Sequence, residues 1–270
     1  MSVQIHPTAI IDKDAQLADG VEIGPYCIIN SGVVIGEGTL LEANVIIDKD
    51  VRIGKNNHFY PNCIIGTRPQ VLRLGKDDKT GGLVIGDGNV IREQVSIHSG
   101  LEEGIPTRIG NENFLMVNVH IGHDCILEDK IVMSNCVQIA GHCKIETGAW
   151  FSGMAGSHQF VTFGKWSYAS GLAGINHDIP PFLIVSGHYP PLIRAVNKRG
   201  LARAGLNEQQ QENILNAYQK LYRRPGALLE KARALEQEDG IDENVRAMVN
   251  AIIRSSEHQH GRYLETRRKH

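Results

Sequence analysis

The sequence is poor in several features that would mark other classes of protein. Its 28 lysines and arginines nearly balance 30 aspartates and glutamates, so a net charge of −2 gives no argument for binding nucleic acid or an anionic membrane. No apolar run reaches the roughly 18 residues of a membrane-spanning helix, and the first residues lack a secretory signal pattern. The five cysteines form no Cys-x-x-Cys pair. We therefore expect a cytoplasmic protein with no nucleic-acid partner and no stable membrane insertion.

Aliphatic residues recur at every sixth position through most of the chain. The series starts with Ile5, Ile11, Leu17 and Ile23, shifts by two residues at an insertion, and continues to Ile175. A period of six fits neither a helix nor a flat strand, and it is typical of a parallel β-helix in which three hexads form one triangular coil. We predict this all-β fold, a triangular prism, for residues 1–180. Side chains 18 residues apart should then stack at roughly 4.8 Å.

Two segments interrupt the repeat, and a different kind of sequence follows it. The insertions lie near residues 67–82 and 99–107, and long loops on a rigid scaffold often carry function. The period ends at a Pro-Pro pair, and beyond about Pro190 the sequence has the character of helices. We expect residues 190–262 to form a small α-helical domain and residues 263–270 to form a frayed basic tail.

Histidines depart from the repeat between residues 118 and 160. Counting in steps of 18 places His123, Gly141 and Gln159 in one column on the outside of the prism. Four other histidines should gather at the same edge of the prism: His98, His120, His142 and His158. His98 joins them if the second insertion is looped out in place of one hexad. Five of the 12 histidines on one patch indicate a functional site, although each of these four could be an ordinary surface histidine.

This column suggests a specific chemistry. A neutral imidazole is a natural general base near pH 7, so His123 is the candidate base. Asp124 could orient it if a corner turns the two side chains together, or it could simply cap a turn. Gly141 has no side chain to block an approaching group, and its N–H could stabilise an oxyanion. No serine lies in the column, so direct transfer is favoured over a covalent intermediate.

The hexads, the motifs HIGHDC, AGH and HQF, and the Pro-Pro pair before a helical segment resemble the UDP-N-acetylglucosamine O-acyltransferase family of lipid A synthesis. The resemblance covers nearly the whole chain. It implies a left-handed parallel β-helix with a C-terminal α-helical domain and a homotrimer with its sites between subunits. It also implies transfer of a 3-hydroxyacyl chain from acyl carrier protein to the 3-hydroxyl of UDP-N-acetylglucosamine. The acyl carrier thioester is then a co-substrate, and no metal or other cofactor is expected.

The resemblance also implies roles for individual residues. His123 would be the general base, Asp124 its support, and Gly141 the oxyanion donor. Candidate substrate contacts are His98, His120, His142, His158, Gln159, Arg73, Asn197, Arg199 and Arg203. The acyl groove would end at Tyr168, Ser170 or Gly171. The acidic carrier protein would meet a basic rim, for which the candidates are Lys165, Arg194, Lys198, Arg199 and Arg203.

Several positions on the ligand side differ from the family pattern. Val71 stands where an acidic residue is expected, Ser99 and Ala204 replace arginines, Arg199 replaces a glutamate, and His188 replaces an asparagine. One alternative is therefore a divergent paralogue that acylates another UDP-sugar or a UDP-amino sugar. Two further alternatives are a non-catalytic scaffold and a zinc hydratase, whose His-x4-His spacing the sequence lacks.

Overall fold

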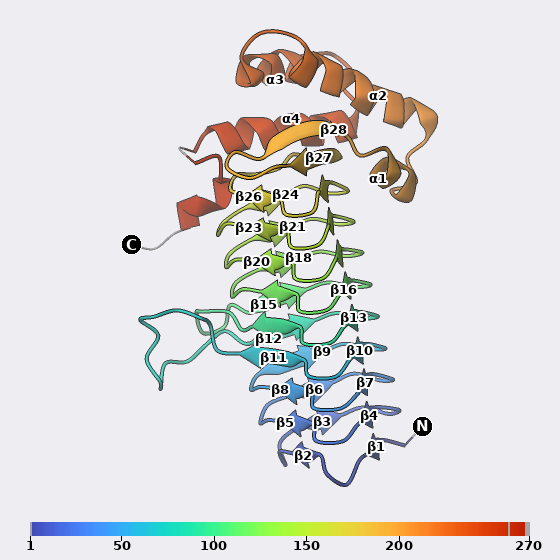
Figure 1. Cartoon of the computed structure of the whole chain (residues 1–270), viewed down its shortest axis with the longest axis vertical. Helices are drawn as coiled ribbons and strands as arrows, with labels where there is room; N and C mark the ends of the chain where they lie inside the picture. Colours follow the sequence, from blue (N-terminus) through green and yellow to red (C-terminus); the bar gives the residue numbers. More distant parts are fainter. Residues whose placement is uncertain (1, 259, 268–270) are drawn as a thin grey trace.

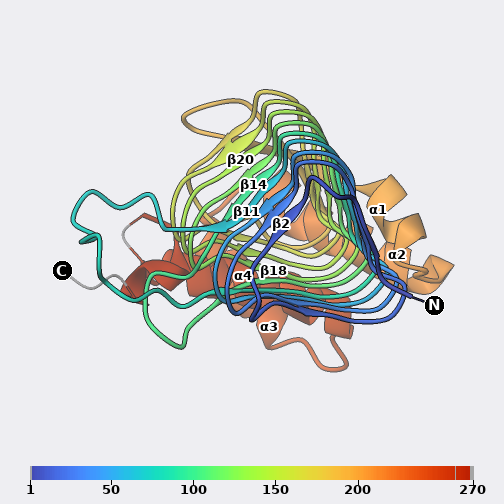
Figure 2. The same cartoon turned by 90° about the horizontal axis from the view of Figure 1, so that it is seen from below.

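Each hexad folds into a short strand followed by a tight corner, and successive coils stack along one axis (Figure 1). The computed structural model describes residues 2–258 and 260–267. Parallel strands form three sheets, which make the faces of the prism seen end-on in Figure 2. The predicted parallel β-helix is therefore confirmed.

The strands are assigned to the three sheets as follows. Sheet A holds, in order, β1 (Gln4–Ile5), β4 (Glu22–Ile23), β7 (Leu40–Leu41), β10 (His58–Phe59), β13 (Val90–Ile91), β16 (Phe114–Leu115), β19 (Val132–Met133), β22 (Trp150–Phe151), β25 (Tyr168–Ala169), β27 (Leu183–Ser186) and β28 (Leu192–Val196). Sheet B holds β2 (Ile10–Ile11), β5 (Ile28–Ile29), β8 (Ile46–Ile47), β11 (Ile64–Thr67), β14 (Ser96–His98), β17 (His120–Ile121), β20 (Gln138–Ile139), β23 (Gly156–Ser157) and β26 (Gly174–Ile175). Sheet C holds β3 (Gln16–Leu17), β6 (Val34–Ile35), β9 (Val51–Ile53), β12 (Leu83–Ile85), β15 (Thr107–Ile109), β18 (Ile126–Leu127), β21 (Lys144–Ile145) and β24 (Thr162–Phe163).

The core is a column of stacked aliphatic side chains. Ile29 pairs with Ile47 and Ile47 with Ile65, each 18 residues on, and all three are at most 1% exposed. Each coil buries its inner face only against its neighbours, so stability comes from stacking. Ile97 pairs with Ile121, 24 residues on instead of 18, because the second insertion adds six residues to this coil.

The two insertions form loops beside the stacked strands. Residues 68–82 connect β11 to β12, and residues 99–106 connect β14 to β15. Figures 1 and 2 show both loops on the same side of the prism. They therefore add material to one edge of the prism without changing the register of the coils.

The end of the β-helix differs from the sequence-based expectation. The chain beyond Pro190 was expected to be helical, but β28 (Leu192–Val196) pairs antiparallel with β27 (Leu183–Ser186). The parallel stack also continues past residue 180, because β27 pairs with β25. The physical reason is that β27 presents a free sheet edge, and a following strand satisfies its backbone groups.

Helices cover the end of the prism that β28 closes (Figure 1). They are α1 (Lys198–Arg203), α2 (Glu208–Tyr218), the π-helix η1 (Gln219–Arg223), α3 (Leu228–Glu236), α4 (Glu243–Ser256) and the 3-10 helix η2 (Tyr263–Arg267). A second core of Phe182, Leu201, Ile214, Met248 and Val249 joins the helices to the last coil. None of the helices in the described ranges is long and apolar enough to cross a bilayer.

The segment expected to be a frayed tail packs against the last coil through residue 263. The Asp178 N–H donates to the Gly261 carbonyl at 2.7 Å, and the Tyr263 N–H donates to Asp178 Oδ2 at 2.9 Å. Arg262 is 7% exposed and donates to the Asn176 carbonyl at 2.9 Å. The expectation was wrong for residues 263–267, because they form the 3-10 helix η2, which the Asp178 carboxylate holds at Tyr263 and in which Leu264 is buried. Residues 268–270 lie outside the described residues.

Close stacking requires glycine at some corners even where φ is ordinary. A Cβ added at Gly36 would lie 2.5 Å from the Gly54 carbonyl oxygen of the next coil. We expect Gly36→Ala to lower the free energy of unfolding by about 1–3 kcal/mol, because the coils would have to move apart. Gly153→Ala is the matched control, since its Cβ would have no neighbour closer than 3.6 Å. Denaturant unfolding of both variants checks this, and equal midpoints would contradict it.

Candidate active site

The predicted column brings an imidazole against a bare glycine. His123 follows β17, Gly141 lies one coil above it, and the His142 N–H donates to the His123 carbonyl at 2.9 Å. A Cβ at Gly141 would lie 2.8 Å from His123 Nε2, so no other residue leaves room for the ring. Among the described residues, the Gly141 N–H has no hydrogen-bond acceptor. A donor therefore lies free beside the imidazole.

A left-handed corner turns His123 and Asp124 toward each other. Asp124 has φ of +60°, and its Oδ2 lies 2.6 Å from His123 Nδ1. With Nδ1 donating its proton to the carboxylate, Nε2 is the ring nitrogen that faces Gly141. Asp124 Oδ1 also accepts from the Leu101 N–H at 3.1 Å, and its own N–H donates to Thr107 Oγ1 at 2.8 Å. Asp124 thus orients the ring and also anchors the second insertion loop.

His142 lies against this pair. Its ring is 4.9 Å from that of His123 and nearly perpendicular to it, and its Nδ1 is 3.8 Å from Asp124 Oδ2. The ligand atoms of His123, Asp124 and His142 lie within 4.8 Å of one another, so the three could hold a metal ion. A metal ion there would bind the nitrogens of His123 and His142 and the Asp124 carboxylate, which also orients the base. Metal binding and general-base chemistry would therefore compete at this place.

Two more of the predicted histidines lie near the base, His120 on the same coil and His98 on the coil below. The rings of His98 and His120 lie 5.1 Å apart. His98 Nδ1 donates to the Arg68 carbonyl at 2.8 Å, which ties the first insertion loop to the site. Burial lowers the pKa of His98, and burial with the nearby His98 and His123 lowers the pKa of His120 to about 4. Both rings are therefore neutral at pH 7.

His158 and Gln159 belong to a neighbouring cavity rather than to the histidine cluster. His158 Nδ1 donates to the Gln159 carbonyl at 3.1 Å. The cavity, of about 510 Å³, runs up the outer face of sheet B from Ala140, next to Gly141. It is lined by Gln138, Ala140, Met154, Gly156, Ser157, His158, Gln159, Leu172, Ala173, Gly174, Ile175, His188 and Tyr189.

The three residues predicted to end the acyl groove do not line this cavity. Tyr168, Ser170 and Gly171 are absent from its wall, whose last residues along the chain are His188 and Tyr189. The loop between β27 and β28 carries these two residues, and the His188 ring packs against Gly174. Hexad counting could not find them because they lie beyond the repeat.

The predicted contacts at the start of the helical domain lie apart from the histidines. Arg199 and Arg203 lie on α1, and Figures 1 and 2 place α1 on the side of the prism opposite the insertion loops. Asn197 is 6% exposed and uses its amide inside the protein, accepting from the Gly200 N–H and donating to the Trp166 carbonyl. Arg73 is exposed on the first insertion loop. One protomer therefore does not bring Asn197, Arg199 and Arg203 together with His123.

Ser99, one of the departures from the family pattern, has a structural environment here. It is 1% exposed, and its hydroxyl donates to the Gly66 carbonyl at 2.6 Å.

Thr107 is a site residue that the hexad pattern does not single out, although its hydroxyl accepts the Asp124 N–H. Counting back 17 residues from Asp124 would have placed it at that corner.

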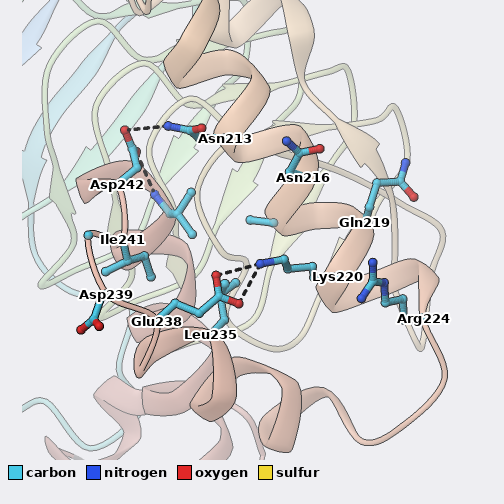
Figure 3. A pocket seen from close by; sticks show the side chains of 13 residues that line it. Asn213, Asn216, Gln219, Lys220, Arg224, Leu235, Glu238, Asp239, Ile241 and Asp242 are labelled. Carbon is cyan, nitrogen blue, oxygen red and sulfur yellow. Dashed lines mark hydrogen bonds and ion pairs between the residues drawn. The ribbon is translucent and has the colours of Figure 1, made fainter.

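A polar pocket of about 390 Å³ lies within the helical domain (Figure 3). Lys220 of η1 forms an ion pair with Glu238 at 2.7 Å, and Asn213 of α2 donates to Asp242 at 3.5 Å. None of the predicted site residues lines this pocket. We do not assign it to the site.

Comparisons with known proteins point in one direction. A family model described as UDP N-acetylglucosamine O-acyltransferase, domain 2, matches residues 178–261, and one for bacterial transferase hexapeptide repeats matches residues 2–37 and 32–67. The chain is similar to the acyl-acyl-carrier-protein–UDP-N-acetylglucosamine O-acyltransferase of Paraburkholderia phymatum, with 40% identity over 93% of this chain and 97% of the relative. The enzyme of the same name from a Janthinobacterium species is 39% identical over 87% of this chain and 89% of its own.

A solved structure agrees with these relatives. The UDP-N-acetylglucosamine acyltransferase of Francisella novicida superposes with a TM-score of 0.88 at 35% identity, covering 92% of this chain and 91% of that one. The likeness therefore includes the helical domain as well as the prism.

The depressed pKa of His120 predicts acid sensitivity. A ring whose pKa falls to about 4 on folding is protonated more readily in the unfolded chain, where its pKa is about 6.5. Its contribution to stability is full above about pH 6.5 and is lost as pH falls toward 4, by at most about 3 kcal/mol. We expect His120→Gln to flatten the dependence of unfolding free energy on pH in this window, while exposed His6→Gln leaves it unchanged. An equally steep loss in His120→Gln would contradict the assignment.

Proposed function

The chain belongs to the UDP-N-acetylglucosamine O-acyltransferase family, and on that premise we propose that His123 acts as the general base in transfer of an acyl chain from acyl carrier protein to the 3-hydroxyl of UDP-N-acetylglucosamine. The observation that carries this proposal is the His123 imidazole, held by Asp124 at 2.6 Å with its Nε2 against Gly141. The matching relatives share the name of this activity, so they do not favour the alternative of a paralogue with another acceptor.

The proposed reaction is a direct transfer. His123 Nε2 takes the proton of the sugar hydroxyl as its oxygen attacks the thioester carbonyl, and Asp124 stabilises the resulting imidazolium. The free Gly141 N–H lies beside Nε2 and would donate to the oxyanion of the tetrahedral intermediate. Collapse of the intermediate forms the ester and breaks the carbon–sulfur bond. The imidazolium then returns its proton to the departing thiolate, so no further cofactor is required.

The assembly in this proposal is a homotrimer. Its support is the position of α1, on the opposite side of the prism from the insertion loops, so that one copy's α1 would meet a neighbour's histidines (Figure 2). Arg199 and Arg203 would then reach a nucleotide bound beside the neighbour's His123, and arginine suits a phosphate partner.

The proposed location is the cytosol. All five cysteines are free, which fits a reducing compartment such as the cytosol.

Two substitutions test the base itself and the space that Gly141 leaves for its ring. We expect His123→Gln to lower kcat by about 100- to 10,000-fold, because the proton acceptor is lost. Gly141→Ala should lower kcat by at least about 100-fold, because its methyl group would displace the ring from the carbonyl. Mass spectrometry of acylated UDP-N-acetylglucosamine measures both, and His6→Gln is the control. Transfer at the parent rate in folded His123→Gln would refute the proposal.

We further propose that the acyl chain lies in the cavity on sheet B and that Tyr189 limits its length. The cavity begins beside Gly141 and its wall includes Met154, Leu172 and Tyr189. Tyr189→Ala should shift the product toward longer chains, by about tenfold in relative rate for each added methylene that the wall now accepts. A ladder of acyl carrier thioesters read by mass spectrometry checks this. A shift in Tyr168→Ala with none in Tyr189→Ala would make Tyr168 the limiting residue instead.

A further inference from the structure

Both tryptophans of the chain lie beside one arginine. Arg203 is the last residue of α1, and its Cζ is 4.8 Å from the ring centroid of Trp150 and 5.4 Å from that of Trp166. These distances are within the range in which a guanidinium is attracted to an aromatic face. We refer to Trp150, Trp166 and Arg203 as the tryptophan–arginine cluster.

The cluster is anchored to the last coils. Trp166 sits at a left-handed corner with φ of +57°, and its indole packs on Gly148 of the coil below, where a Cβ would overlap the ring. Asn197 Nδ2 donates to the Trp166 carbonyl at 2.8 Å, which fixes the start of α1 to the same corner. Leu201 of α1 is fully buried in the second core. The helix and the tryptophans therefore form one fixed unit.

The Arg203 guanidinium has unused hydrogen-bonding capacity. Within residues 2–258 and 260–267 it has neither a hydrogen bond nor an ion pair, and its side chain is exposed. An aromatic face attracts the charge but accepts none of the five N–H groups in the plane of the guanidinium. Two of these groups can bind phosphate oxygens side by side while the flat face stays on the indoles.

We infer that Trp150 and Trp166 are positioning residues, which hold Arg203 ready to bind the diphosphate of a UDP-sugar in the site of a second copy of this chain. The inference rests on the proposed function. An arginine free in solvent loses rotamer freedom when it binds a ligand, whereas a stacked arginine has lost most of it on folding. The tryptophans thus act on affinity for the nucleotide and not on the transfer step.

Steady-state kinetics test this separation. Trp150→Leu should raise the KM for UDP-N-acetylglucosamine about tenfold, with kcat and the KM for the acyl carrier substrate changed by less than about twofold. Trp150→Phe should retain most of the parent affinity, because a phenyl face still attracts a cation. Arg203→Lys keeps the charge but loses the planar stack, and should behave like Trp150→Leu.

Tryptophan emission gives a second readout that needs no catalysis. Since both tryptophans belong to the cluster, binding of UDP alone should change the emission of the parent protein and leave that of Arg203→Ala unchanged. The Kd for UDP from this titration should rise about tenfold in Trp150→Leu. Arg233→Ala, an equal loss of charge on α3, is the matched control and should bind UDP like the parent.

The outcomes separate the two proposals. An unchanged Kd for UDP in folded Trp150→Leu and Arg203→Lys, or a rise in the KM for the carrier substrate alone, overturns the role of the cluster. If Trp150→Leu does not fold, Arg203→Lys decides by the same titration. A parent protein that forms no acylated UDP-N-acetylglucosamine refutes the proposed function instead, while UDP titration still reports on the cluster.

Discussion

The backbone hydrogen bonds between coils fix the position of every group in the candidate site. The His142 N–H bonded to the His123 carbonyl at 2.9 Å is one such contact, and it puts Gly141 directly over the imidazole. Coils separated by one strand spacing, about 4.8 Å, leave no room for a side chain between the ring and the next backbone. The position of the Gly141 amide beside the base therefore follows from coil stacking as well as from its proposed role in the reaction.

Features that follow the repeat could be predicted from the sequence, and features that depend on other contacts could not. Counting by 18 placed His123 under Gly141 because the register of parallel coils is local and regular. The β27–β28 pair depends on a free sheet edge, which no hexad pattern records. Asn197 looked like a ligand contact, but its amide is used by Gly200 and Trp166, which only the docking of α1 reveals.

The charges of the proposed site are divided between two edges of the prism. Burial lowers the pKa of His98 and His120, so these neighbours of the base are neutral at pH 7 and add no positive charge that would hold off the proton His123 must accept. The arginines of α1 lie on the other side of the prism. In the proposed trimer a diphosphate would meet these arginines, and the reacting hydroxyl would meet His123 beside the neutral His98 and His120. Subunit assembly would thus join the groups that bind the anion to a base whose neighbours His98 and His120 carry no charge.

The antiparallel β28 also has a consequence for self-association. A parallel β-helix is in principle open at both ends, and an exposed parallel edge is a template on which another chain can extend the stack into a fibre. Because β28 reverses direction, with Val185 opposite Ile193, an incoming coil would meet a strand of the wrong polarity at this end. The reversal thus works against polymerisation of the protein.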